Sequence, residues 1–319
     1  MENNYLLIFA LFVAVIITFF VLNRLLKSTN WFKNQFVDSK KFLIDMPHNL
    51  EIVNLGSTQA KYAFDYHSTG LLGMNWALSP QPFEYDFKIL KQYSENIKKG
   101  AFVLITVCPF SYFVHRYSHN SSNIKYYPFL HPTSINNYSA TKKLIAMNYP
   151  ILNAKKQILR MIIDVPADQG MDLSHNPMSY SEIKKDALRW INGWKNEFRL
   201  NDIDNIILSA ENNSNIKKNI SLMNEILTFC GEKKCKPVFI LLPVTNELSN
   251  YFSQEFMNDY VLNYIKQSNT QNFAILNYFN DQRFQSPELY INSFFLNEKG
   301  RNLLTKTVID DLLIYKHCE

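Results

Sequence analysis

The chain lacks the short motifs that mark many nucleotide-dependent and metal-dependent enzymes. It contains no phosphate-binding loop, no dinucleotide-binding fingerprint and no zinc-binding helix motif. Glycine is scarce, with eight in 319 residues, whereas Asn, Lys and Ile are plentiful. We attribute that bias to an AT-rich genome rather than to a function. The sequence therefore predicts no cofactor.

A concentration of charge of one sign is also missing. The 33 basic and 28 acidic residues give a net charge of +5, spread along the chain without a basic stripe interleaved with aromatic residues. We therefore expect no nucleic-acid partner. A content of 47% hydrophobic and 19% charged residues is typical of a globular domain and excludes a disordered chain.

The four cysteines do not complete a metal site. They are Cys108, Cys230, Cys235 and Cys318, and no second pair or His cluster accompanies Cys230 and Cys235. We interpret these two as ordinary thiols, with a local disulfide as the alternative if the domain is exported. Asp65, Asp86 and Asp164 are interpreted as isolated carboxylates in solvated or capping roles, and no metal is expected.

One long apolar run stands at the N-terminus. Tyr5 to Leu22 is 18 residues long and spans roughly 27 Å as a helix, close to the thickness of a bilayer's hydrocarbon core. A cleaved signal peptide would have a basic leader and a small-residue cleavage site, and neither is present. We expect a single-pass membrane anchor at residues 1–27, followed by a polar-aromatic connector at 28–49.

Beyond the connector, short apolar runs alternate with helical patterns. Ala101 to Val107 is the clearest buried strand, continuous and bounded by Gly100 and Pro109. Alternating strands and helices predict an α/β fold, with helices on both faces of a parallel five-stranded sheet, over residues 50–319. The strands are expected at 50–55, 71–78, 101–107, 237–242 and 272–277, and the helices at 58–66, 82–99, 215–229, 254–267 and 297–315.

The alternation stops between about residues 110 and 205. This insert holds Tyr- and His-rich loops and one convincing helix at 181–198, on which Trp190 and Trp194 lie on one face. A stretch this long without strands is more typical of a lid or docking surface than of a linker.

Three sequence blocks carry candidate chemistry. The first, Asn54-Leu-Gly-Ser-Thr58, places Ser57 where a strand meets a helix; the alternative for a serine there is a plain helix cap. The second runs from Gly73 to Gln81, and the third is Tyr290-Ile-Asn-Ser-Phe-Phe-Leu-Asn-Glu-Lys-Gly300.

These blocks resemble those of the SGNH (GDSL-like) hydrolase superfamily, in particular a membrane-anchored, DltD-like group associated with surface polysaccharides. The resemblance covers roughly residues 52–107 and 237–304. It implies a three-layer, flavodoxin-like α/β/α fold. It also implies Ser57 as nucleophile, with backbone groups of the first two blocks and Ser79 around the oxyanion. In that family an Asp orients a His three residues later, but this chain has Asn292 at the Asp place and Phe295 at the His place.

The missing base leaves two functional hypotheses open. The first is an esterase or O-acyltransferase acting on a cell-surface polysaccharide, in which His115 or His119 would substitute as base; His67 is too far from Ser57. The second is a catalytically inactive accessory subunit that binds a glycan or a polytopic membrane acyltransferase. In either case Ser57 and the segment 292–295 are expected at the same sheet edge.

The side of the membrane is argued both ways. Arg24, Lys27 and Lys33 follow the apolar run, and the positive-inside rule then places the large domain in the cytoplasm. The family resemblance instead implies an extracytoplasmic domain at the cell membrane.

Overall fold

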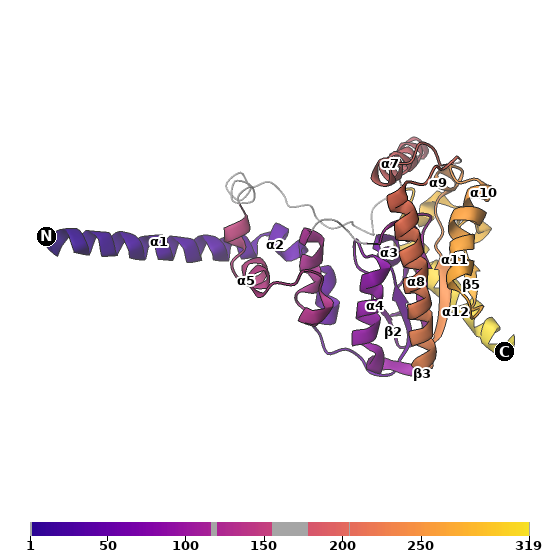
Figure 1. The fold of residues 1–319 in the computed structure, drawn as a ribbon, viewed down its shortest axis with the longest axis horizontal. Coiled ribbons are helices and arrows are strands. Elements are labelled where there is room, and N and C mark those ends of the chain that lie inside the picture. Colours follow the sequence, from indigo (N-terminus) through magenta and orange to yellow (C-terminus); the bar gives the residue numbers. More distant parts are fainter. Residues whose placement is uncertain (1, 116–119, 155–177, 204, 319) are drawn as a thin grey trace. The chain divides into compact units, whose positions relative to one another are not determined.

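A five-stranded, fully parallel sheet forms the centre of the fold (Figure 1). The computed structural model describes residues 2–115, 120–154, 178–203 and 205–318. The strand order is β2-β1-β3-β4-β5, the order of doubly wound flavodoxin-like sheets. The predicted fold class is therefore confirmed. The strands are β1 (Leu50–Leu55), β2 (Gly73–Asn75), β3 (Ile97–Val107), β4 (Lys236–Leu241) and β5 (Ile275–Asn277).

Helices cover both faces of this sheet. On one face α4, α8 and α11 pack together, and on the other α3 packs against α12. The bounds of these helices are α3 Thr58–Ala63, α4 Phe83–Gln92, α8 Ala210–Glu232, α11 Asn263–Ser268 and α12 Glu298–Cys318. Three further helices are α7 (Tyr180–Phe198), α9 (Asn246–Ser249) and α10 (Gln254–Phe256), and a π-helical stretch, Met257–Leu262, joins α10 to α11.

Alternate residues of the strands supply the two halves of the core. Ile52 of β1, Leu104 of β3 and Ile240 of β4 are fully buried in the cluster that includes Leu304 and Val308 of α12. Their neighbours in sequence point to the opposite face, as the period of two of a strand requires. Continuous apolar runs such as Ala101 to Val107 arise because both faces of a parallel sheet are buried.

The helix predicted over residues 82–99 ends early. The α4 helix stops at Gln92, and Ile97 already pairs with Leu50 as the first residue of β3. The apolar spacing predicted too long a helix because Ile97 continues the helical pattern of apolar residues although it belongs to β3. Gly100 is not a helix stop: it lies within β3, where its φ of +81° accompanies an irregularity in the pairing with β1.

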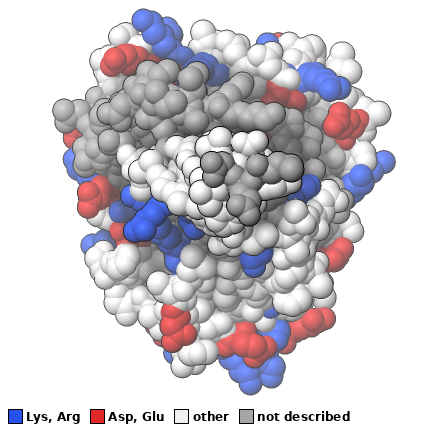
Figure 2. Space-filling view, turned by 90° about the vertical axis from the view of Figure 1, so that its left-hand side faces the viewer, with Lys and Arg blue, Asp and Glu red and all other residues white. Residues whose placement is uncertain are grey.

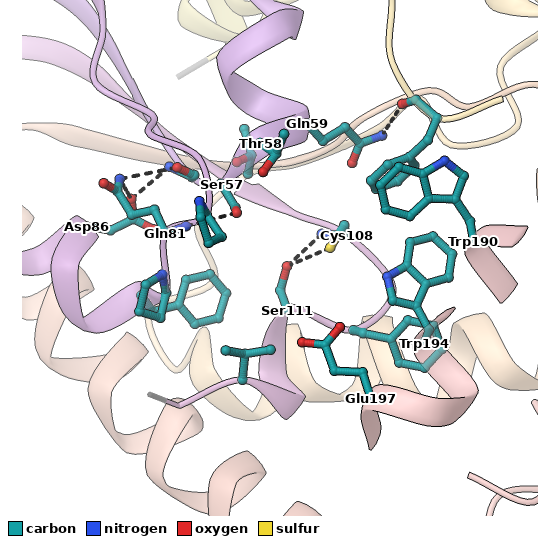
Figure 3. A pocket seen from close by; sticks show the side chains of 18 of the residues that line it. Ser57, Thr58, Gln59, Gln81, Asp86, Cys108, Ser111, Trp190, Trp194 and Glu197 are labelled. Carbon is teal, nitrogen blue, oxygen red and sulfur yellow. Dashed lines mark hydrogen bonds between the residues drawn. The ribbon is translucent and has the colours of Figure 1, made fainter. Parts of the chain in front are cut away.

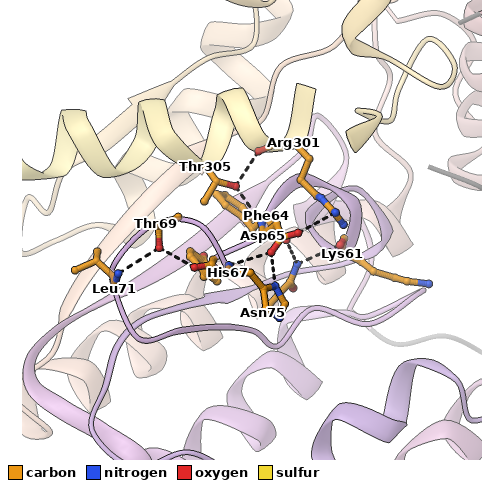
Figure 4. Close-up of polar contacts among 10 residues, drawn as sticks. Lys61, Phe64, Asp65, His67, Thr69, Leu71, Asn75, Arg301 and Thr305 are labelled. Carbon is orange, nitrogen blue, oxygen red and sulfur yellow. Dashed lines mark hydrogen bonds and ion pairs between the residues drawn. The ribbon is translucent and has the colours of Figure 1, made fainter. Parts of the chain in front are cut away.

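The first helix after β1 is also shorter than predicted, and a side-chain amide explains its end. The Nδ2 group of Asn75 donates to the carbonyl oxygens of Ala60, Lys61 and Phe64 at 3.1, 3.1 and 3.2 Å (Figure 4). These groups are the orphan acceptors of a helix C-terminus, so the amide acts as a cap. The chain then leaves α3 in extended conformation at Phe64.

Asp65, directly beyond this cap, joins α3 to α12. Its backbone N–H donates to Thr305, and its carboxylate accepts a hydrogen bond from Arg301 at 2.9 Å (Figure 4). Partial burial alone would raise the pKa of Asp65, but the hydrogen bonds from His67 and the charge of Arg301 lower it. Asp65 is therefore a structural ion-pair residue and not an isolated carboxylate.

The chain divides into two compact units. The sheet unit comprises residues 46–118 and 173–319, and the anchor unit comprises residues 1–45 and 119–172. The insert expected at about 110–205 contributes to both, because α7 belongs to the sheet unit. On the described part of the face drawn in Figure 2, basic and acidic side chains are interspersed.

The anchor unit begins with a long apolar helix, α1 (Glu2–Ser28). Its stretch Asn4–Ser28, 25 residues long, could cross a membrane by length and composition, although a signal sequence passes the same test. Within this unit the Ser39 hydroxyl donates to the Lys125 carbonyl, and the rings of Phe42 and Phe129 stack at 4.3 Å. The remaining elements are α2 (Asn30–Asn34), α5 (Ala140–Asn148) and short 3-10 turns at 38–42, 120–126, 132–134 and 150–153.

Candidate functional site

A cavity of about 330 Å³ opens beside the turn that follows β1. Its walls come from four places: the β1–α3 turn, the segment before α4, the loop after β3 and, opposite these, α7 with the third sequence block. The carboxyl ends of parallel strands are where ligands of open α/β sheets bind. The wall of Ser57, Gln81 and Asp86 is polar, whereas Trp190 and Trp194 face it across the cavity (Figure 3).

Gly56 allows the chain to turn into the cavity wall. Its φ is +135°, and a Cβ at this position would lie 1.8 Å from Oγ1 of Thr106 in β3. Only glycine fits such a close approach in that conformation. The next residue, Ser57, is partly buried and precedes α3 without capping it: its side chain accepts no helix N–H. Ser57 thus occupies the N-cap position of α3, but its hydroxyl does not serve as the cap.

The Ser57 hydroxyl is instead held by the second block. Its Oγ accepts a hydrogen bond from the backbone N–H of Gln81 at 3.0 Å. The Gln81 side chain, only 3% exposed, donates to the carbonyl oxygen of Gly56 at 3.2 Å and to Oδ1 of Asp86 at 2.6 Å. Gln81 therefore ties together both sides of the Ser57 turn.

Asp86 is the buried carboxylate behind this turn. It lies on α4, is 2% exposed, and accepts the backbone N–H of Gly56 at 2.8 Å besides the Gln81 amide. Burial raises its pKa to about 7, although both hydrogen bonds lower it. The sequence interpretation of Asp86 as a solvated or capping carboxylate is wrong, because the side chain is buried against the Ser57 turn. The spacing of residues along the chain does not reveal that the first turn of α4 faces that turn.

Ser79, the residue expected near the oxyanion, is bonded elsewhere. Its hydroxyl and that of Thr58 are 2.8 Å apart, and Ser79 is not among the residues that line the cavity. The second block does reach Ser57, but through the backbone of Gln81.

The third block supplies an aromatic wall at the place where the sequence resemblance implies an Asp and a His. Oδ1 of Asn292 accepts the backbone N–H groups of Phe294 and Phe295 at 2.9 and 2.8 Å, so this amide folds the block on itself. Phe295 is 2% exposed, lines the same cavity as Ser57, and packs on Tyr62 and Trp190 with ring centroids 5.3 and 5.5 Å away. The expected meeting of the first and third blocks at one sheet edge is thus observed.

The rest of this block is structural. Asn297 donates to the carbonyl oxygen of Glu288 at 2.6 Å and accepts the N–H of Gly300 at 3.0 Å. A Cβ at Gly300 would lie 2.1 Å from the Leu289 carbonyl oxygen. The Leu-Asn and Gly positions therefore fasten the block to the start of α12.

The α7 helix closes the aromatic side. Oδ2 of the buried Asp186 accepts both the backbone N–H and the hydroxyl of Ser293, at 3.1 and 2.7 Å, while its Oδ1 pairs with Arg189. One and two turns further along α7, Trp190 and Trp194 pack on Phe294, with ring centroids 4.9 and 5.2 Å away. The predicted helix is present, and it begins one residue earlier, at Tyr180, with Ser179 as its capping residue.

Of the two candidate substitute bases, His115 does not line the cavity. Nδ1 of His115 lies 3.1 Å from Oδ1 of Asn219 on α8. His119 lies outside the described residues. His67 pairs with Asp65 at the far end of α3. Among the described residues that line the cavity, none is a histidine.

Sequence reasoning missed several lining residues. Cys108 and Ser111 follow β3, and the Ser111 hydroxyl donates to the Cys108 sulfur at 3.2 Å. Burial raises the pKa of Cys108, so its thiol is not activated. Glu197, on the last turn of α7, also lines the cavity. Their place at the ends of β3 and α7 depends on tertiary packing, and no sequence signal beyond those elements could have found them.

No metal centre or disulfide is found in the part of the chain that the structure describes. Cys230 and Cys235 are both free, as the ordinary-thiol interpretation predicts. No group of three His, Cys, Asp or Glu side chains is close enough to hold a metal ion among the described residues.

Comparisons with known proteins give a fold likeness without a family. No family model and no curated protein matches the chain. The psychrotrophic esterase EstA from Pseudoalteromonas sp., in a structure inhibited by monoethylphosphonate, is 10% identical over 84% of this chain and 99% of its own, with a TM-score of 0.37. A Streptococcus pneumonia protein named for platelet activating factor is 12% identical over 93% of this chain and 99% of its own, with a TM-score of 0.37. At these values the likeness carries no argument about function, which rests on the site itself.

Proposed function

We propose that the sheet unit is an SGNH-like ester-handling domain that acts on an acylated cell-surface polysaccharide, with Ser57 as the residue that meets the acyl group. The observation that carries this proposal is the placement of Ser57. Its hydroxyl lies at a strand-to-helix turn, on the wall of a 330 Å³ cavity, and accepts a backbone N–H from Gln81.

The chemistry available at this serine is limited. In an acyl transfer, Oγ of Ser57 attacks the ester carbonyl, the alkoxide leaves, and water or a second hydroxyl takes the acyl group from the serine. The N–H of Gln81 favours negative charge on Oγ, but the described lining offers no imidazole to take the serine proton. The proton then passes to solvent, so we expect turnover to be slower by several orders of magnitude than with a complete triad.

A second candidate function is a non-catalytic accessory subunit, favoured by the wall at Phe295. Phe295 lines the cavity, packs on Tyr62 and Trp190, and cannot exchange a proton at the place where a base is expected. In this role the cavity would bind a glycan, or a polytopic membrane acyltransferase would be the partner. The apolar helix α1 would hold the domain at the cell membrane, on its outer side.

Fluorophosphonate labelling separates the two candidates. Labelling of the full-length protein in detergent that is slow but lost in Ser57→Ala supports ester chemistry at Ser57. Labelling that persists in Ser57→Ala, or none at any concentration, removes the first candidate and leaves the accessory role. His115→Ala should label like the native protein, because His115 is bonded to Asn219 away from the cavity. Protease protection of the sheet unit in intact cells would overturn the extracytoplasmic placement.

A further inference from the structure

The cavity is acidic although the protein is basic. The net charge of the chain is +5, yet the acidic and basic side chains in the described cavity wall are two carboxyl groups, those of Asp86 and Glu197, with no Lys or Arg. Asp86 is occupied by the Ser57 turn, as its bonds to Gly56 and Gln81 show. Glu197 is therefore the carboxylate in the described cavity wall that can contact a ligand.

Glu197 has no partner of its own within the described part of the chain. It forms no hydrogen bond or ion pair there, and the neighbouring cations are turned to other carboxylates: Lys195 lies 3.9 Å from Asp202 and Arg199 lies 3.8 Å from Glu211. Although Glu197 as a whole residue is exposed, desolvation raises the pKa of its carboxyl group. Figure 3 shows this group turned toward Ser111 and the cavity.

Aromatic rings line the same cavity as this carboxylate. The Trp194 ring, one turn before Glu197 on α7, has Phe110 and Phe294 at centroid distances of 5.3 and 5.2 Å, and Trp190 at 5.5 Å. Aromatic faces attract organic cations, and a partly desolvated carboxylate adds a charge of opposite sign. The buried indole N–H of Trp190 also lacks an acceptor among the described residues, and a saccharide oxygen could supply one.

We propose that the cavity selects a saccharide with a protonated amine, that is, an amino sugar whose nitrogen is not acetylated, held between Glu197 and the Trp194 ring. This assignment rests on the proposed function, since it names the sugar class of the same cavity. The rival is a neutral sugar whose hydroxyls donate to Glu197, and the test is built to tell the two apart.

The test is calorimetric titration of the full-length protein in detergent with glucosamine, glucose, N-acetylglucosamine and glucuronic acid. Glucosamine should bind at least about tenfold more tightly than glucose or N-acetylglucosamine, and glucuronic acid most weakly. The preference should vanish in Glu197→Gln and persist in Glu211→Gln, a matched change outside the cavity. Tetramethylammonium should compete with glucosamine in the native protein, which requires no variant to fold.

Each contrary result has its own meaning. Equal binding of glucosamine and glucose overturns the amine assignment but leaves the proposed function standing. An amine preference that persists in Glu197→Gln has the same two consequences. Absence of binding by all four sugars overturns the amine assignment together with the saccharide part of the proposed function, while labelling at Ser57 is scored independently.

Discussion

The two walls of the cavity are held by different forces. The Ser57 wall is held by directional hydrogen bonds. Asp86 accepts the N–H of Gly56, and the Gln81 amide donates to the Gly56 carbonyl oxygen and to Asp86. The wall of Phe294 and Phe295 is fixed mostly by ring packing against α7. The hydrogen-bonded turn fixes the position of the Ser57 hydroxyl for a ligand. The packed aromatic wall instead offers a ligand a shaped, polarisable surface. The cavity thus places a serine hydroxyl opposite an aromatic wall, and its described lining contains no histidine.

The largest effect is expected from breaking the polar wall at its turn. In Gly56→Ala the new Cβ would lie 1.8 Å from Thr106 Oγ1, in a backbone conformation that disfavours side chains. We expect a loss of about 4 kcal/mol or more in folding free energy, seen as a large fall in the thermal midpoint. Gly193→Ala is the control: it meets nothing within 4 Å in the middle of α7 and should stabilise by up to about 1 kcal/mol. Equal midpoints would contradict the close approach.

The second prediction uses the raised pKa of Asp86. Burial raises this pKa to about 7 in the folded protein, whereas an unfolded chain has a value near its ordinary 3.8. Between these values the folded state keeps a proton that the unfolded state has lost. The contribution is therefore full below about pH 4 and falls, by up to roughly 4 kcal/mol, as pH rises to about 7. The difference in midpoint between the native protein and Asp86→Asn, measured across this range, isolates that slope; an unchanged difference would refute it.

Restoring a base to the aromatic wall is expected to have a somewhat smaller effect. An Asp at 292 can accept the same two backbone N–H groups as the Asn292 amide, and a His at 295 would lie on the cavity wall shared with Ser57. Asn292→Asp with Phe295→His should raise hydrolysis of a small activated ester about 100-fold, and more than either change alone. A folded double variant without any gain would show that the third block does not align with the family's dyad.

The smallest effect tests how the aromatic wall is fastened. Asp186→Ala leaves the buried N–H of Ser293 without its acceptor and should cost about 2 kcal/mol. Arg189→Ala removes only the outer partner, whose side chain is 63% exposed, and should cost less than about 1 kcal/mol. The two variants are compared by thermal midpoint; a larger loss for Arg189→Ala would mean that the ion pair, and not Ser293, fastens α7.

Sequence alone was sufficient for the parts of the fold that rest on local patterns. The strand at Leu50–Leu55 was predicted to the residue, because a run buried on both faces leaves an unbroken apolar signal. The start of β3 was missed, since Ile97 fits a helical stripe and only its pairing with Leu50 decides the matter. Position in the sheet, and not composition, settles such segments.

The site was predictable only where it lies on those patterns. Ser57 could be placed from the strand and helix that flank it, and Phe295 from its spacing in the third block. The sequence could not place Asp86, Gln81 and Glu197 in the site, because their roles depend on which helix turn faces the cavity. Ser79 was chosen by resemblance, and its hydroxyl bonds to Thr58 instead.

The tryptophan pair on α7 has an optical consequence. Of the four tryptophans, Trp190 and Trp194 line the cavity with ring centroids 5.5 Å apart, while Trp76 is fully buried. Their intrinsic emission should shift when a ligand displaces water from the indole faces, and a soluble quencher should reach them more readily than Trp76. The cavity therefore carries its own spectroscopic reporter, and unlabelled protein can be screened against compound collections without any assumption about turnover.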